Sequence, residues 1–215
     1  MALSPHVIGA GGFRRSLLAL VTSGFRPVIV SVSVLIVAAT ASCSSPPPLA
    51  IDVSGAWTTR TIDHSGLSLS VPANWNVGEA DVMAGSFTDL IGSFSNQSLS
   101  PPCTTGPNTI ECGLPLTLLQ PGAMLVVVWH NGSPQWTIDS QPGTPTTVSR
   151  LQARVTDQLG AHGLCSGLGA DRTRTEVIAF PDAPDNYFEV DICSRGVADA
   201  VGTKVMGSVQ VTPTA

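Results

Sequence analysis

The feature that most limits what this chain can fold into is a change of character at Cys43. Before it lie three arginines, no acidic residue, and an uncharged run at 27–42 that is rich in Val, Ile, Leu and Ala. A basic region followed by a short apolar run and small residues is typical of a secretory signal peptide. A membrane-spanning helix needs roughly 20 apolar residues, and this run is shorter. We therefore expect residues 1–42 to be a signal peptide that takes no part in the folded domain.

Residues 39–43, with the sequence ATASC, resemble the lipobox of bacterial lipoproteins. In that family the cysteine thiol receives a diacylglyceryl group, and signal peptidase II then cleaves before the cysteine. The resemblance implies a protein held at the extracytoplasmic face of the cell membrane by a covalent diacylglycerol and acyl lipid (palmitate) on Cys43, with no other cofactor. Thr40 stands where the family usually has leucine. The alternatives are an uncleaved signal anchor and cleavage by the ordinary signal peptidase.

The residues that follow the predicted cleavage point form a linker and then a single domain. Residues 43–56 begin with CSSPPP, and proline-rich chain of this kind acts as a semi-rigid spacer. We expect the domain to span 57–215. After Cys43 the chain holds all 15 acidic residues and 7 of the 10 basic ones, because three arginines lie before it. This acidic balance excludes a nucleic-acid partner, since phosphate contacts need clustered Lys and Arg. Membrane contact is expected through the lipid anchor alone.

The number of cysteines fits export to an oxidising compartment. The chain has five, so four remain if Cys43 carries lipid. Four cysteines allow three pairings, and proximity in the sequence favours Cys103–Cys112 and Cys165–Cys193. Metal binding is not expected, because no two cysteines have the Cys-x-x-Cys spacing and no histidine lies at ligand spacing.

Two candidate sites remain. His130 follows a predicted buried strand and, with Trp129 and Trp136, could line a pocket, the alternative being that these are ordinary core residues. Cys165 lies in a Gly-x-Cys-x-Gly pattern that superficially resembles a nucleophile elbow. That motif requires a strand before the nucleophile, and the residues before Cys165 are not a convincing one. We therefore expect Cys165 to be a structural cysteine.

A cluster of acidic residues surrounds one predicted hairpin. Its members are Asp182, Asp185, Glu189 and Asp191. Carboxylates can bind Ca²⁺, but this spacing is not that of an EF-hand loop. We interpret the cluster as a solvated acidic edge of a sheet.

Short runs of alternating or β-branched residues predict a mostly antiparallel sheet. The run at 123–129 is continuously apolar, which is typical of a central strand buried on both faces. The run at 187–193 alternates cleanly, with its apolar residues at 188, 190 and 192. Residues 143–147 are expected to be a connector. Strands are predicted at 58–62, 67–71, 87–94, 123–129, 176–180 and 187–193.

Four valines at four-residue steps, Val197, Val201, Val205 and Val209, predict a helix over 197–209 that packs on the sheet. The expected fold class is therefore α+β, a mostly antiparallel sheet with a C-terminal helix on one face. Residues 69–75, LSVPANW, resemble small sheet-and-helix domains of actinobacterial lipoproteins, some of them similar to the PsbP/Mog1-like fold. The resemblance implies a binding or scaffolding role and transfers no catalytic residue.

No catalytic set stands out in the sequence, which has no evident nucleophile with its base and no phosphate-binding loop. We therefore expect a lipid-anchored cell-envelope protein whose domain binds an envelope protein or a small molecule. The alternative is an envelope hydrolase with a site near His130 or Cys165. A purely structural envelope component is a third hypothesis.

Overall fold

The computed structural model describes residues 47–52, 54–62, 65–78, 80, 88–105, 110–132, 136–180, 183 and 185–212. The predicted signal peptide, Cys43 and the first residues of the predicted linker lie outside the described residues. Among the helices in the described ranges, none has the length and apolar character needed to cross a membrane.

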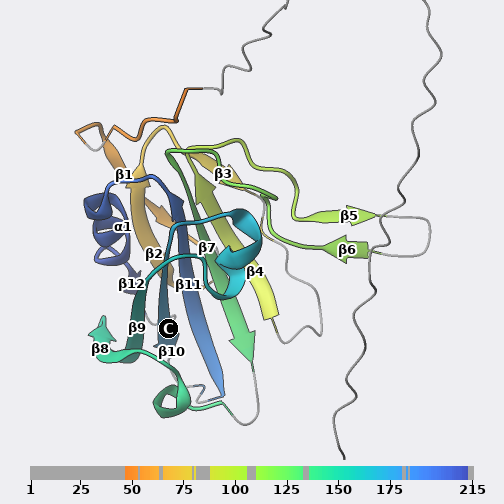
Figure 1. Cartoon of the computed structure of the whole chain (residues 1–215). Coiled ribbons are helices and arrows are strands. Elements are labelled where there is room, and N and C mark those ends of the chain that lie inside the picture. Colours follow the sequence, from red (N-terminus) through yellow and green to blue (C-terminus); the bar gives the residue numbers. More distant parts are fainter. Residues whose placement is uncertain are drawn as a thin grey trace, which may run out of the picture. The chain divides into compact units, whose positions relative to one another are not determined.

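The centre of the fold is an antiparallel sheet of seven strands with β11 in the middle (Figure 1). The spatial order is β3-β4-β7-β11-β10-β9-β8, and every neighbouring pair is antiparallel. The predicted mostly antiparallel sheet is confirmed. Its strands are β3 (Asn76–Gly78), β4 (Thr88–Ser95), β7 (Ala123–Gly132), β8 (Thr144–Val148), β9 (Leu151–Leu159), β10 (Arg172–Ala179) and β11 (Asn186–Arg195).

A smaller sheet of three strands contains the first predicted hairpin. In it β1 (Trp57–Thr61) pairs with β2 (Leu67–Pro72), and β12 (Gln210–Val211) pairs with the other edge of β2. Every second residue of β2 is buried, as the two-residue period of a strand requires when one face is covered. The small sheet therefore offers an apolar face to the rest of the domain.

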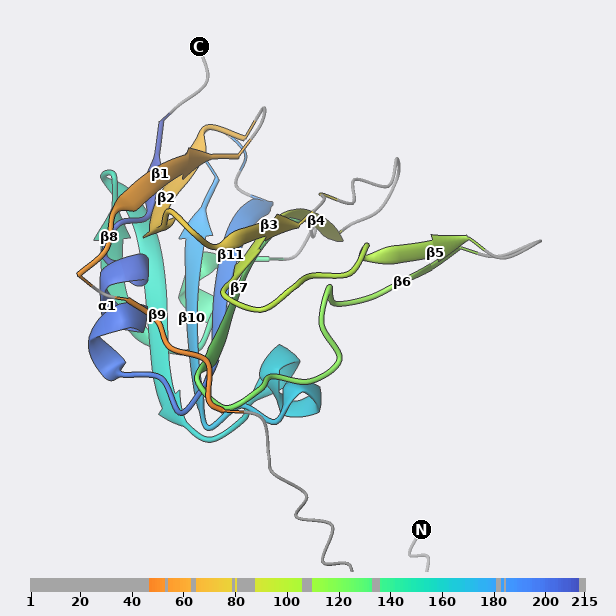
Figure 2. The ribbon, with the colours of Figure 1, turned by 90° about the horizontal axis from the view of Figure 1, so that it is seen from above.

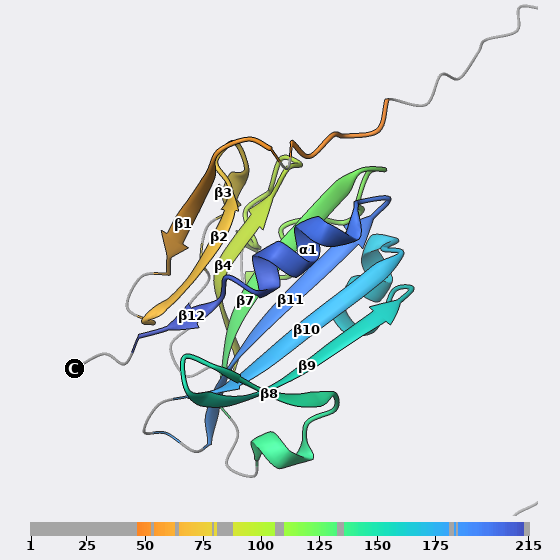
Figure 3. The ribbon, with the colours of Figure 1, turned by 90° about the vertical axis from the view of Figure 1, so that its left-hand side faces the viewer.

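One face of the seven-stranded sheet, here called the covered face, is closed by the small sheet and by α1 (Asp199–Met206), which crosses the strands in Figure 3. β11 contributes its apolar residues at 188, 190 and 192 to this face, as its alternation predicts. They are at most 1 % exposed. Burial of a large apolar side chain stabilises the fold by about 2 kcal/mol, so this cluster is the main core. Its members from the helix, the small sheet and β7 include Val201, Val205, Leu67, Leu69, Val71, Met124, Val126 and Val128.

The helix is shorter than the sequence predicts. Val201 and Val205 lie in α1, whereas Val197 precedes it and Val209 follows it. All four valines nevertheless contact the covered-face core. The four-residue spacing thus identified the buried positions, but only its middle part is helical because the backbone turns at Gly207 and then enters β12.

Residues 143–147, expected to be a connector, were interpreted wrongly, because β8 covers almost all of them. β8 pairs with β9 along its whole length, although its first four side chains are exposed. A strand at the edge of a sheet can be held by backbone pairing alone and then shows no apolar alternation. The two-residue loop that joins β8 to β9 consists of Ser149 and Arg150, both with positive φ (50° and 74°).

The buried charges next to α1 are paired. Arg174 is 4 % exposed and forms ion pairs with Asp157 of β9 and Asp199 of α1. Arg172 binds the same two carboxylates. A Cβ atom at Gly202 would overlap the Arg174 guanidinium, so the glycine leaves the space that this cation fills. The cluster ties α1 to the sheet.

The opposite face, here called the cavity face, is closed at one end by a second apolar cluster. There the 3-10 helix η2 (Gly163–Leu168) is joined to β11 by the disulfide Cys165–Cys193. The second disulfide, Cys103–Cys112, joins β5 (Cys103–Thr105) to β6 (Ile110–Cys112). These two strands form an arm that stands away from the sheet in Figure 2. Both disulfides are the pairs that proximity in the sequence favours.

Candidate functional site

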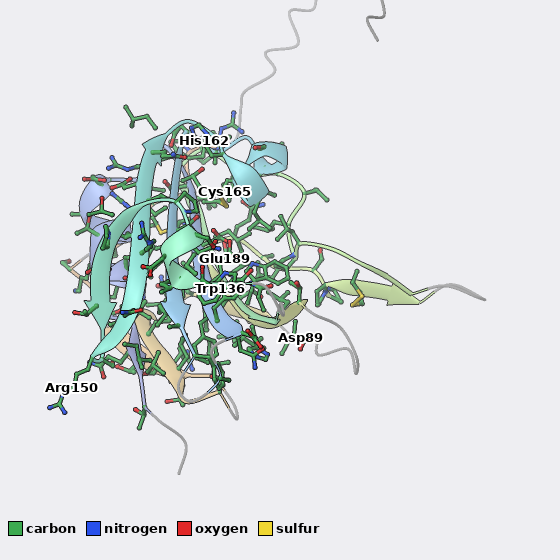
Figure 4. The ribbon with its side chains drawn as sticks, turned by 90° about the horizontal axis from the view of Figure 1, so that it is seen from below. Asp89, Trp136, Arg150, His162, Cys165 and Glu189 are labelled. Atoms are coloured by element: carbon green, nitrogen blue, oxygen red, sulfur yellow. A yellow bond between two sulfur atoms is a disulfide. The ribbon has the colours of Figure 1, made fainter. Side chains whose placement is uncertain are left out.

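Two adjoining cavities lie on the cavity face. The first, of about 230 Å³, is lined by β9, β10, β11, residues 141–142 and residues 162–164. The second, of about 250 Å³, is lined by side chains from β4, β7, β11 and η2. Leu164, Glu189 and Asp191 line both cavities. The two carboxyl groups therefore lie where the cavities meet, and Figure 4 shows Glu189 between Cys165 of η2 and Trp136 in that view.

The alternation of β11 places both carboxyl groups on this face. Its apolar residues point to the covered face, so Glu189 and Asp191 point the other way. The strand register then sets Glu189 beside Trp129 of β7 and Val177 of β10, and Asp191 beside Thr175 of β10. The walls next to the carboxyl pair are consequently an indole ring, a hydroxyl group and an aliphatic side chain.

Neutral donors hold the carboxyl pair in place. The Thr175 hydroxyl donates to Asp191 over 2.6 Å, and the Asn131 amide donates to Glu189 over 3.1 Å. Asp191, which is 4 % exposed, also accepts hydrogen bonds from the Trp129 indole and from the Glu189 carboxyl group. None of these donors carries a positive charge.

Burial raises the pKa values of both carboxyl groups. It raises the pKa of Glu189 to about 7, and the neighbouring charge of Asp191 and the hydrogen bond that Glu189 donates to it act in the same direction. It raises the pKa of Asp191 to about 6, against the opposing effect of the hydrogen bonds from Thr175, Glu189 and Trp129. Near neutral pH Glu189 is therefore still partly protonated, whereas an exposed carboxyl group would be fully ionised.

The structure divides the residues Trp129, His130 and Trp136 between two faces. Trp129 lines the second cavity, whereas His130, its neighbour in β7, points to the opposite face and packs against Phe180 with ring centroids 5.3 Å apart. Nδ1 of His130 lies 3.9 Å from the Asp89 carboxylate. Trp136 is 8 % exposed and stacks on Tyr187, on the cavity face, at 4.2 Å. Trp129 thus lies beside the carboxyl pair and Trp136 lies on the same face of the sheet, whereas the histidine lies on the other face.

Cys165 offers no nucleophile. Its sulfur is bonded to Cys193 and its side chain is fully buried. A nucleophilic cysteine needs a free thiolate that a substrate can reach. The pattern around Cys165 therefore serves to fix η2 over the cavities, where Leu164 and the neighbouring His162 form part of the wall.

The acidic cluster read from the sequence is not a solvated edge as a whole, and this interpretation needs correction. Asp185 is exposed as expected, and Asp182 lies outside the described residues. Asp191 and Glu189, however, are turned into the cavities. Cys193 shares their face and was expected to form a disulfide, so a covering segment over this face could have been inferred from the alternation of β11.

The two adjoining cavities, here together called the pocket, have the chemistry of a binding site for a small polar molecule. Its walls combine aliphatic and indole surface with hydroxyl, amide and carboxyl groups, including Leu164, Val177, Thr156, Gln158, Thr173 and Gln141. In the described part of the chain, no group of three or more His, Cys, Asp or Glu side chains is arranged to hold a metal ion.

Comparison of the chain with protein-family models, with curated proteins and with solved structures finds no match. The functional argument therefore depends on the site itself.

Proposed function

We propose that the protein is a lipid-anchored protein of the cell envelope whose domain binds a small polar ligand, without catalysis, in the pocket at Glu189 and Asp191. The observation that carries the proposal is the position of the buried Asp191 and the partly buried Glu189 where two cavities meet. A buried carboxyl group costs free energy unless it is hydrogen-bonded, so a pair of them facing open space is poorly explained by stability alone. A ligand that supplies the missing donors explains their presence.

Binding is favoured over hydrolysis because neither residue of the hydrolase alternative, Cys165 or His130, offers a reactive group to the cavities. Cys165 is in a disulfide, and His130 points to the other face. Thr175 donates its hydroxyl proton to Asp191, and the histidine of the cavity wall, His162, has its Nε2 atom at the Leu159 carbonyl oxygen. The arrangement can hold and orient a molecule through fixed hydrogen bonds.

The anchor is proposed from the resemblance of residues 39–43 to a lipobox and from the proline-rich linker that follows. Intact-mass measurement of the protein extracted from membranes tests it. We expect a chain that begins at Cys43 and carries diacylglycerol and acyl groups. A Cys43→Ser variant is expected to leave the membrane fraction, and a variant that stays there with its N-terminal residues attached would indicate a signal anchor instead.

Ligand-observed NMR with a library of small polar compounds tests the pocket, using the protein purified in detergent. Leu164 lines both cavities, so Leu164→Trp fills them, whereas Leu159 is 79 % exposed and Leu159→Trp is the matched control. We expect compounds that bind the wild type and Leu159→Trp but not Leu164→Trp. Binding that Leu164→Trp leaves intact, or no binding by any compound, would contradict a ligand pocket.

A further inference from the structure

The carboxyl pair is a largely buried negative charge without a cation in the walls around it. Glu189 and Asp191 are the charged side chains among the residues that line the two cavities, and His162 is the third titratable one. Among the described residues, no lysine or arginine lines either cavity. Ionised groups in protein interiors are normally paired or bound to a cation. The covered face follows that rule at Arg174, and the cavity face does not.

The charged groups nearby are engaged elsewhere. Arg154 of β9 shares this face, but it donates to the Gly143 carbonyl oxygen over 3.2 Å and lies 3.6 Å from Asp139. Arg195, at the far end of β11, donates to the Leu119 carbonyl oxygen. His162 has its Nε2 atom 2.9 Å from the Leu159 carbonyl oxygen. Tyr187 is a neutral neighbour, and burial and the charge of Glu189 raise its pKa further.

The hydrogen-bonding capacity of the pair is only partly used. Two ionised carboxylates offer about eight acceptor positions. The Asn131 amide, the Thr175 hydroxyl and the Trp129 indole supply three donors from the walls. Both carboxyl groups line the cavities, where Leu164 and other aliphatic side chains provide apolar surface. An ammonium group carries three donors and a positive charge, and a short alkyl chain suits the apolar wall.

We propose that the pocket binds a small organic cation, a primary ammonium with a short apolar chain, through the Glu189–Asp191 pair. This inference rests on the proposed function and names the class of its ligand. A cation beside the pair favours the form in which both groups are ionised. Binding therefore releases the proton that the empty pocket retains, and by linkage affinity rises as protons leave the pair with increasing pH.

Three matched probes test the ligand class: n-butylammonium, n-butyramide and n-butyrate, each titrated into the detergent-purified protein and followed by ligand-observed NMR. Butylammonium stays protonated from pH 5 to pH 8. We expect it to bind at least about tenfold more tightly at pH 8 than at pH 5, because both carboxyl groups ionise within this range. The neutral amide and the anion are expected not to compete with it. Equal binding of butyramide, or affinity that does not change with pH, would overturn the inference.

Charge-neutral variants locate the effect. Glu189→Gln and Asp191→Asn are each expected to weaken butylammonium binding roughly tenfold or more and to flatten the pH dependence. Glu176→Gln, a carboxyl that lines neither cavity, is the matched control and should bind as the wild type does. His162→Gln should keep the pH dependence, which separates the pair from the histidine in the wall. Urea unfolding of each variant verifies that it is folded.

The outcomes separate this inference from the proposed function. If library compounds bind in a Leu164→Trp-sensitive manner but butylammonium does not, the ligand class is wrong and the pocket remains. If calcium chloride displaces butylammonium at lower concentration, the site is one for an inorganic cation and the organic class is wrong. If neither the library nor any probe binds, both proposals fail.

Discussion

The two faces of the seven-stranded sheet treat buried charge differently. On the covered face Arg174 is held between two carboxylates, and the surrounding core is closed by α1 and the small sheet. On the cavity face Glu189 and Asp191 are held by neutral donors and by each other, next to open space. The first arrangement completes its charge balance within the chain, as a structural cluster does. The second leaves it incomplete, as a binding site does.

Glu176 shows that burial of a carboxyl group does not by itself mark a site. It lies on the covered face, is 6 % exposed, and has a pKa that burial raises to about 7. Its Oε2 atom has no hydrogen-bond partner in the described part of the structure, yet Glu176 lines neither cavity. The cavity face differs because its two carboxyl groups with raised pKa values lie next to each other, are held by hydrogen bonds, and line a space that a ligand can enter.

The largest expected effect on stability comes from truncating one large core side chain of the covered face. Phe188 is fully buried there and contacts Phe180. Phe188→Ala is expected to lower the free energy of unfolding by about 3–5 kcal/mol, because a buried aromatic ring is lost and a cavity remains. Leu164→Ala, on the cavity face, removes a half-buried side chain and should cost about 1 kcal/mol. Urea denaturation measures both, and equal losses would break the distinction between a closed and an open face.

The next effect is a fall in stability as the pH rises. Glu176, Glu189 and Asp191 have higher pKa values in the folded protein than in the unfolded chain, so between about pH 4.5 and pH 7 the folded state holds protons that the unfolded state has released. Stability therefore decreases across this window, by up to about 1.4 kcal/mol per pH unit for each group. Unfolding free energies at several pH values measure the slope.

Single variants divide that slope between the faces. Glu176→Gln should remove the part of the pH dependence that comes from the covered face. Asp191→Asn should reduce the part that comes from the cavity face. Saturating butylammonium should restore stability at high pH in the wild type and in Glu176→Gln but not in Asp191→Asn. A slope that none of the three variants Glu176→Gln, Asp191→Asn and Glu189→Gln reduces would contradict the assignment of raised pKa values to these groups.

A smaller effect concerns the charge cluster of the covered face. Replacement of glycine by alanine within a helix normally stabilises it by about 1 kcal/mol. Gly202→Ala should instead destabilise the domain by about 2 kcal/mol, because the new Cβ atom overlaps the Arg174 guanidinium and disturbs its ion pairs. Ala200→Gly, at an exposed position of the same helix, is the control and should follow ordinary propensity. Thermal unfolding gives the sign, and a stabilised Gly202→Ala protein would show that the cluster is loosely held.

The smallest effect is expected at the β8–β9 loop, far from the pocket in Figure 4. Two-residue hairpin loops with positive φ at both positions favour glycine at the second. Arg150 has φ 74° there, so Arg150→Gly should stabilise the protein by about 0.5–1 kcal/mol. Butylammonium affinity should not change. The hydroxyl of Ser149, which accepts from the backbone N–H of Val211, should be kept because it holds β12.

Elements with a strong local pattern could be predicted from the sequence. The apolar run of β7 and the alternation of β11 reflect which side chains are buried, and burial is what those periods record. The edge strand β8 could not be recognised, because Thr144–Val148 is held by its pairing with β9 and not by a buried face. The two cysteine pairs could be predicted because each joins the cysteines that are nearest to each other in the sequence.

The candidate site was less accessible to sequence reasoning. The alternation of β11 placed Glu189 and Asp191 on one face, but the same pattern describes a strand with a solvated side. Only the tertiary fold brings Leu164 and Trp129 over these carboxyl groups, from segments that are distant in the chain. The long-range packing of η2 and β7 against one strand, not any local motif, turns two ordinary acids into a pocket.

The pairing of β12 with β2 has a consequence for when the domain can fold. Val211 of β12, the last described strand, lies opposite Leu67 of β2, a strand near the start of the domain. β12 therefore pairs along the edge of β2 that β1 leaves open. Contacts between such distant segments form slowly, because a long loop must close before they gain anything. While the chain is being synthesised, the edge of β2 that faces away from β1 therefore has no strand partner until residue 211 has been made. The small sheet can consequently be completed only after nearly all of the described domain has been synthesised.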